Sequence, residues 1–141
     1  MNKAGPIIVI EDDLDDQDMF KVVFNELKVK NEVLFFGDGL AALAYLTASK
    51  DQPFLILSDV NLPKLNGLEL RDKVHNNESL KLKCIPYLFF TTSANQASVI
   101  QAYSKSVQGF FTKPDNFKKL TRMMHHIIEY WKDCHSPDIV E

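Results

Sequence analysis

The amino-acid sequence predicts an α/β domain in which a five-stranded parallel sheet carries helices on both of its faces. Five short apolar runs recur along the chain of 141 residues. Apolar rather than alternating runs are typical of parallel strands that are covered on both sides. The runs alternate with helix-like stretches in units of about 28 residues, near the size of a strand–helix repeat. Right-handed crossovers between such units place helices on both faces of one sheet.

The candidate strands are short and mostly apolar. They cover residues 6–10, 32–36, 54–58, 86–91 and 108–111. The second strand is followed by Gly37 and Asp38, and we interpret Asp38 as a turn residue rather than part of a site.

Two of the five predicted helices have a clear apolar stripe. In the first helix, the stripe residues at i, i+3, i+4 and i+7 are Phe20, Val23, Phe24 and Leu27. The last helix has the longest stripe, which consists of Phe117, Leu120, Met124, Ile127, Ile128 and Trp131. Asp115, just after Lys113 and Pro114, is the expected N-cap of this last helix.

Three helices between these two have weaker patterns. They are marked by Leu40, Leu43 and Ala44, by Leu68, Leu70 and Val74, and by Val99, Ile100 and Tyr103. The third helix follows the turn-forming stretch NLPKLNG, and the stretch HNNESLKLKCIP after it predicts a long connection to the fourth strand.

Composition favours a single cytoplasmic domain over residues 1–141, with a core from about 6 to 131 and a frayed tail at 134–141. A net charge of −3 gives no basic excess for nucleic acid, and no apolar run reaches the roughly 18 residues of a membrane span. The N-terminus leaves no room for a signal peptide. Cys84 and Cys134 lack a metal-binding spacing and are expected to be reduced thiols, while the adjacent His125 and His126 cannot share a metal.

Charged and hydroxyl side chains follow four of the five predicted strands. Glu11 and Asp12 follow the first strand, Asp59 the third and Lys113 the fifth, while Thr91 ends the fourth. Ligands of open α/β sheets bind outside the carboxyl ends of the strands, so these side chains are expected at one edge. Acidic caps, a loop lysine and a strand-end threonine are each common in ordinary structure, and only their joint placement favours a site.

Three carboxylates at one edge would repel one another unless a divalent cation held them, and hard oxygen ligands favour Mg²⁺. A carboxylate such as Asp59 can itself attack phosphorus and form an aspartyl phosphate. Lys113 and Thr91 would then neutralise the phosphoryl group and donate a hydrogen bond to it. The neighbouring acidic residues Asp13, Asp15 and Asp16 are expected to begin the first helix, whose positive dipole end tolerates anions.

Four stretches occur together in a fixed order: IIVIEDD, ILSDVNLPKLNG, YLFFTTSA and GFFTKP. In this combination the chain resembles the receiver domain of two-component response regulators, of the single-domain chemotaxis-regulator type, from about Pro6 to Trp131. The resemblance implies a doubly wound, flavodoxin-like sheet with the strand order 2-1-3-4-5. It also implies a phosphoprotein that catalyses only its own phosphorylation and dephosphorylation and is not otherwise an enzyme.

The resemblance assigns a role to each site residue. Asp59 would be the phospho-acceptor, and Mg²⁺ or Mn²⁺ would bind Glu11, Asp12, Asp59 and the main-chain carbonyl of Asn61, with Asp12 the more direct ligand of the acidic pair. Lys113 would pair with the phosphoryl group, and its bond to Pro114 would be cis.

The resemblance also implies a switch. Thr91, 22 residues before Lys113, would be the hydroxyl that moves to meet the phosphate, and Phe110 would be the aromatic switch residue. Asn61 and Ser93 occupy the positions that tune phosphate lifetime. Thr92 departs from the family pattern, where a small residue is usual, and would restrict access to the phosphoryl site.

Several functions remain open at this stage. A stand-alone receiver would accept phosphate from a histidine kinase or phosphotransfer protein; a phosphate shuttle or sink and a non-phosphorylated scaffold are the alternatives within the family. A phosphohydrolase with an aspartate nucleophile needs a general acid two residues on, where this chain has Asn61. A flavin-binding module is disfavoured because the acidic loop after the first strand would repel a phosphate.

Expected partners follow from the same resemblance. Output would reach a target protein, or a second copy of the chain, through the fourth helix, fifth strand and fifth helix, with no nucleic acid and no membrane insertion. Met19 and Val22, on or beyond the border of the first helix's stripe, are candidates for docking a kinase helix bundle; scattered exposed apolar residues are the ordinary alternative.

Overall fold

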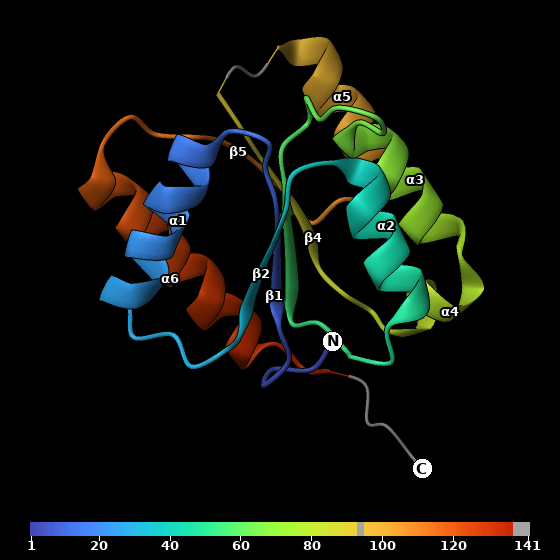
Figure 1. The fold of residues 1–141 in the computed structure, drawn as a ribbon, viewed down its shortest axis with the longest axis horizontal. Coiled ribbons are helices and arrows are strands. Elements are labelled where there is room, and N and C mark those ends of the chain that lie inside the picture. Colours follow the sequence, from blue (N-terminus) through green and yellow to red (C-terminus); the bar gives the residue numbers. More distant parts are fainter. Residues whose placement is uncertain (93–94, 137–141) are drawn as a thin grey trace.

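The computed structural model describes residues 1–92 and 95–136. Its sheet contains five parallel strands in the order β2-β1-β3-β4-β5, which confirms the expected fold (Figure 1). The strands are β1 Ile7–Ile10, β2 Val33–Phe36, β3 Leu55–Ser58, β4 Tyr87–Thr91 and β5 Gly109–Thr112. Each lies within one residue of its predicted position.

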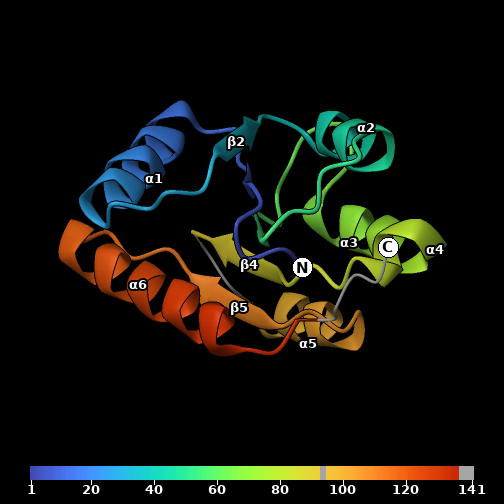
Figure 2. The same ribbon diagram turned by 90° about the horizontal axis from the view of Figure 1, so that it is seen from below.

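Six helices cover the sheet in the described part of the chain. They are α1 Leu14–Glu26, α2 Gly39–Ala48, α3 Gly67–Asn76, α4 Glu78–Leu82, α5 Gln96–Ser104 and α6 Phe117–Asp133. Figures 1 and 2 show α1 and α6 side by side on one face, with α2 to α5 on the other. No described helix is both long and apolar enough to cross a bilayer.

The sheet separates two apolar cores because successive side chains of a strand point to opposite faces. Ile8 and Ile10 of β1 belong to the core beneath α2, α3 and α5, whereas Ile7 and Val9 belong to the core beneath α1 and α6. All four side chains are at most 1% exposed. The strands are continuously apolar because both of their faces are buried. This pattern was the basis for predicting a parallel sheet.

Because β1 and β3 are parallel and in register, their carboxyl ends lie side by side at the same edge of the sheet. Ile10 of β1 lies opposite Ser58 of β3, and the backbone ladder continues one step beyond both strands. The N–H of Asp59 donates to the carbonyl of Ile10 at 3.0 Å, and the N–H of Glu11 donates to the carbonyl of Phe36 at 2.9 Å. The first residue after each strand is thus held by the sheet itself.

The sequence analysis missed one helix and placed the N-cap of another at the wrong residue. The connection before β4 contains the short helix α4, which buries only Leu80 and therefore has no apolar period that a sequence could reveal. Asn116, not Asp115, caps α6: its side chain accepts from the N–H of Lys119 at 3.1 Å. Asp and Asn are about equally good caps, so composition alone could not choose between adjacent positions.

Arg71 on α3 is a buried cation that the sequence did not indicate, at 5% exposed. Its Nε donates to the carbonyl of Lys105 at 3.0 Å, and its Nη2 donates to the carbonyl of Ser106 at 2.7 Å. The guanidinium also lies 5.4 Å from the centre of the Tyr87 ring. Arg71 thereby ties α3 to the connection between α5 and β5.

Replacing Arg71 by Met is expected to lower the free energy of unfolding by about 2 kcal/mol, because two partly buried hydrogen bonds from a buried guanidinium to backbone carbonyls are lost. The exposed Lys73 lies on the same helix, and Lys73→Met is the matched control, expected to change stability by less than about 0.5 kcal/mol. Urea unfolding of both variants measures the difference. Equal effects would contradict a structural role for the guanidinium.

Candidate functional site

The carboxyl edge of the sheet gathers the acidic side chains predicted to lie there. Glu11 and Asp12 follow β1, and Asp59 follows β3. One carboxylate oxygen from each of the three residues lies within 4.8 Å of the others. Glu11 and Asp59 are buried while Asp12 is exposed, so the cluster is open on the side of Asp12. Hard oxygen donors at this spacing fit a divalent cation such as Mg²⁺, which usually takes one or two carboxylates and keeps several waters.

Lys113 reaches this cluster from the end of β5. Its Nζ donates to Glu11 Oε2, to Asp59 Oδ2 at 2.9 Å and to Asp16 Oδ2 at 2.9 Å. Only 8% of the lysine side chain is exposed. Burial by itself lowers the pKa of Lys113, but the hydrogen bonds to Glu11, Asp16 and Asp59 outweigh it and raise that pKa above its ordinary value. The lysine therefore remains positively charged beside Asp59.

The carboxyl group of Glu11 is buried and its pKa is raised. Its side chain is 2% exposed, and its Oε1 accepts from the N–H of Asp13 at 3.1 Å. Burial raises the pKa of Glu11 to about 7, with a contribution from the negative charge of Asp59; the bonds from Lys113 and Asp13 oppose this shift without cancelling it. A bound cation would favour the ionised form.

Asp59 is fixed through both its side chain and its backbone. Its Oδ1 accepts from the N–H of Asn61 at 3.1 Å, and its carbonyl accepts from the Ser58 hydroxyl at 2.8 Å. A Cβ on Gly67, the first residue of α3, would lie only 2.1 Å from that carbonyl oxygen. Glycine is required at position 67 because the start of α3 packs directly against the backbone of Asp59.

The other acidic residues begin α1, as predicted. Asp13 is the N-cap and accepts from the N–H groups of Asp15 and Asp16 at 2.8 and 3.1 Å. The contact from Asp16 to Lys113 was not predicted. Gln17 was also missed; its Nε2 donates to the carbonyl of Glu11 at 2.6 Å. The sequence did hold a signal for Asp16 and Gln17. Both lie in the first turn of a helix that follows a strand directly, and such a turn must lie over the carboxyl edge of the sheet.

Thr91 and Phe110 lie on neighbouring strands. Thr91 is 1% exposed, and its carbonyl accepts from the N–H of Lys113 at 2.7 Å, so β4 positions the lysine backbone. The Phe110 ring is half-buried and lies 5.8 Å from the Phe89 ring, tilted by 47°. The switching role of both residues stays a prediction.

The remaining expected site residues differ in their placement. Asn61 and Thr92 are exposed, whereas Ser93 lies outside the described residues. The expectation of a cis bond between Lys113 and Pro114 was wrong, because the described residues contain no cis peptide. The trans form is favoured by about 0.5–1 kcal/mol before proline, and in this structure it already allows Lys113 to reach its three carboxylates.

The turn and thiol predictions fit the structure. Asp38 is the N-cap of α2, where its side chain accepts from the N–H of Ala41 at 2.7 Å, and it is no part of the acidic cluster. Cys84 and Cys134 are both free thiols.

A fold of this topology with these residues at its carboxyl edge has clear relatives. A family model described as the response regulator receiver domain matches residues 7–125. Response regulator Rcp1 of Synechocystis sp. is 35% identical over 135 residues, which cover 92% of this chain and 90% of Rcp1. Among solved structures, the phosphorylated cyanobacterial phytochrome response regulator RcpA superposes with a TM-score of 0.84 at 30% identity, covering 94% of this chain and 98% of RcpA.

The Mn(2+)-bound form of Rcp1 is similar to the same extent, with a TM-score of 0.81 at 33% identity and coverage of 94% of this chain and 99% of that one. The family match spans most of the chain, and Rcp1 is of nearly the same extent. The chain is therefore a member of the receiver-domain family of two-component response regulators.

Proposed function

We propose that this chain is a phospho-acceptor switch that takes a phosphoryl group from a cytoplasmic histidine kinase or phosphotransfer protein onto Asp59. The observation that carries the proposal is the position of Asp59 Oδ2, which accepts from Lys113 within a cluster of three carboxylates. The solved structure of RcpA is of a phosphorylated form, and that of Rcp1 is of a Mn²⁺-bound form. These are properties of relatives, and they support the same chemistry in this chain.

In this mechanism an oxygen of Asp59 attacks the phosphorus of a phosphohistidine. A new O–P bond forms as the P–N bond of the donor breaks, and the electron pair of that bond leaves with the imidazole nitrogen. Lys113 stays protonated and stabilises the negative charge of the phosphoryl oxygens. Glu11, Asp12 and Asp59 would hold Mg²⁺, with the main-chain carbonyl of Asn61 as a further ligand. The cation would neutralise charge on the attacking carboxylate and on the phosphoryl group.

The output of the switch would leave through contact with another protein. Thr91 would follow the new phosphoryl group, and the packing of Phe110 against Phe89 would change with it. The helix after Thr91, α5, exposes Ile100 and Tyr103, which are 61% and 54% accessible. This surface suits a target protein or a second copy of the chain. A phosphate shuttle in a relay is the alternative, because phosphotransfer needs the acidic site but no such output.

Incubation with acetyl phosphate and Mg²⁺ is expected to add one phosphoryl group to the wild type, as measured by intact mass. Asp59→Asn, which keeps the size of the side chain, is expected to add none, and omission of Mg²⁺ is expected to abolish the addition. A folded wild-type protein that gains no mass would exclude the switch and favour the scaffold alternative. Thr92→Ala then tests whether the threonine blocks access.

Mg²⁺ is expected to bind about tenfold more weakly at pH 6 than at pH 8, because Glu11 must lose its proton to act as a ligand. The pKa of Glu11 is about 7 in the folded chain and 4.5 without the fold. The folding stability of the metal-free protein depends on pH in the opposite direction to Mg²⁺ binding. The raised pKa of Glu11 stabilises the folded state at low pH, and this stabilisation is lost as pH rises through about 7. Calorimetric titration with MgCl₂ measures the Mg²⁺ affinity at each of the two pH values.

The matched variant Glu11→Gln is expected to bind Mg²⁺ weakly with little dependence on pH in this range. The same pH dependence in Glu11→Gln as in the wild type would assign the titration to another group.

Thr91→Ala is expected to keep most of the phosphoryl acceptance but to lose the change at the output surface, because the hydroxyl senses the product rather than performing the transfer. Amide chemical shifts of α5 and β5, recorded before and after acetyl phosphate, measure the change. Phosphorylation-dependent shifts of wild-type size in the variant would contradict the assignment. A Thr91→Ser variant, which keeps the hydroxyl, is the control and is expected to retain the shifts.

A further inference from the structure

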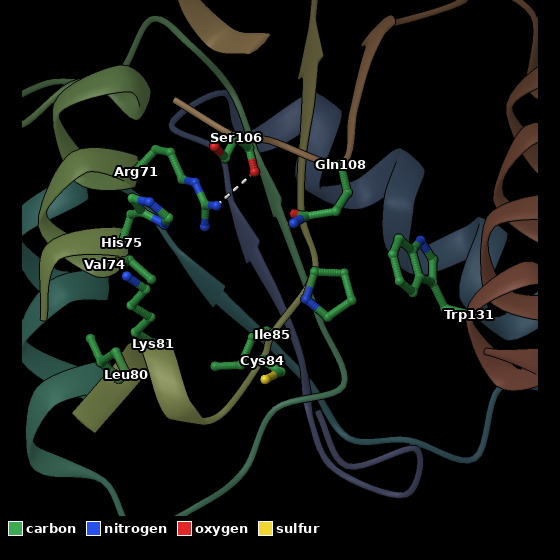
Figure 3. A pocket seen from close by; sticks show the side chains of 11 residues that line it. Arg71, Val74, His75, Leu80, Lys81, Cys84, Ile85, Ser106, Gln108 and Trp131 are labelled. Atoms are coloured by element: carbon green, nitrogen blue, oxygen red, sulfur yellow. Dashed lines mark hydrogen bonds between the residues drawn. The ribbon is translucent and has the colours of Figure 1, made fainter. Parts of the chain in front are cut away.

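A second site lies at the opposite end of the sheet from Asp59. A cavity of about 280 Å³ opens beside Pro86 and Gln108, which immediately precede β4 and β5. Its walls come from α3 and α4 on one side and from Trp131 of α6 on the other (Figure 3). The short helix α4, which the sequence did not reveal, closes the lower part of the wall with Leu80 and Lys81. Helices from both layers therefore border the cavity, which lies at the amino ends of the strands.

The polar lining of this cavity includes the cations Arg71 and Lys81 and the donors of His75 and Gln108, together with Ser106 and Cys84. Arg71 uses Nε and one hydrogen of Nη2 on backbone carbonyls, and Nη1 makes no hydrogen bond to another described residue. Figure 3 shows the guanidinium beside His75 and above Lys81. Gln108 approaches from the opposite side; its Oε1 accepts from the N–H of Tyr87 at 2.7 Å, so its NH₂ is the group left to donate. No carboxylate occurs among the described residues that line the cavity.

The rest of the lining is apolar and flat. Val74, Ile85 and Pro86 belong to the apolar lining. The indole of Trp131 lies on the opposite side of the cavity from Val74 (Figure 3). A guanidinium presents paired N–H donors that match the geometry of a carboxylate. The volume lies near the lower end of the range of about 300–1,000 Å³ found for small-molecule pockets. The lining thus combines a site for one planar anion with an apolar surface for a small ring or chain.

We propose that this cavity binds a small organic carboxylate with a flat apolar body. The carboxylate contacts Arg71, with His75, Lys81 and the Gln108 amide around it, and the apolar part lies against Trp131. This site is separate from the phosphoryl chemistry, since it lies at the amino ends of β4 and β5 whereas Thr91 and Lys113 lie at their carboxyl ends. Its ligand contacts the same guanidinium that holds the end of α5 through Lys105 and Ser106.

Benzoate is a suitable probe, with the isosteric neutral amide benzamide as its control. Trp131 is the single tryptophan of the chain and reports on the cavity by its fluorescence. At constant ionic strength and constant pH, benzoate is expected to give a saturable change, and benzamide to bind at least about tenfold more weakly because it lacks the charge. Amide chemical shifts of α3 and of residues 105–108 locate the site independently of fluorescence.

Arg71 itself supports the fold, so the decisive variants lie elsewhere. Lys81→Glu places a negative charge at the mouth of the cavity and is expected to weaken benzoate binding at least about tenfold. Lys73→Glu makes the same charge change on α3 at an exposed residue outside the cavity lining and is expected to leave binding within about twofold. Asp59→Asn is expected to bind benzoate like the wild type, whatever the outcome of phosphorylation.

The proposal would be overturned by the absence of a saturable change up to the solubility limit of benzoate, by equal binding of benzoate and benzamide, or by equal effects of Lys81→Glu and Lys73→Glu. Chemical shifts confined to residues away from the cavity would also overturn it, since the binding would then belong to another surface.

Discussion

The contacts of one ammonium group hold the carboxyl edge of the sheet together. Lys113 Nζ contacts carboxylates from the end of β1, from the first turn of α1 and from the end of β3, and its partner Glu11 lies 102 residues earlier in the chain. Without a cation, two buried carboxylates and a third within 4.8 Å would be strongly unfavourable. The lysine therefore compensates the negative charge of these carboxylates, and it joins the last strand to the first.

The two buried cores fix the positions of the strands, and with them the positions of the side chains at the carboxyl edge. Each strand contributes to both cores, so a strand cannot shift along its neighbours without moving apolar side chains out of place on both faces. The residues after β1 and β3 are fixed by backbone hydrogen bonds that extend the ladder by one step. Gly67 adds a second constraint from the side, since α3 begins in direct contact with the carbonyl of Asp59. Rigid elements thus hold the carboxylate of Asp59 in place.

The fold and the main residues of the acidic site were readable from the sequence because both depend on strong local patterns. Apolar runs identify buried parallel strands, and parallel strands bring the residues that follow them to one edge. Contacts set by three-dimensional packing were not readable. Asp16 looked like one more acidic residue of a helix start, Arg71 like one more surface cation, and α4 buries too little apolar surface to show a period. The proline bond was misjudged because its geometry was taken from the resemblance rather than from the residues around it.

Acidic side chains gather at the carboxyl edge of the sheet, and basic side chains line hollows at its amino edge. The carboxyl edge carries Glu11, Asp12, Asp13, Asp15 and Asp59, whereas the amino edge carries Arg71 and Lys81, and a nearby hollow is lined by Lys3, Lys28, Lys30 and Lys132. Basic residues also lie at the start of α6, where Lys118, Lys119 and Arg122 line a hollow, so the two signs of charge form local patches and do not divide the molecule into two halves. Such charged patches orient an approaching partner before contact, and their effect weakens as salt is added. A partner with a basic face is drawn toward the acidic cluster around Asp59, and one with an acidic face toward the basic hollows, so that orientation precedes recognition.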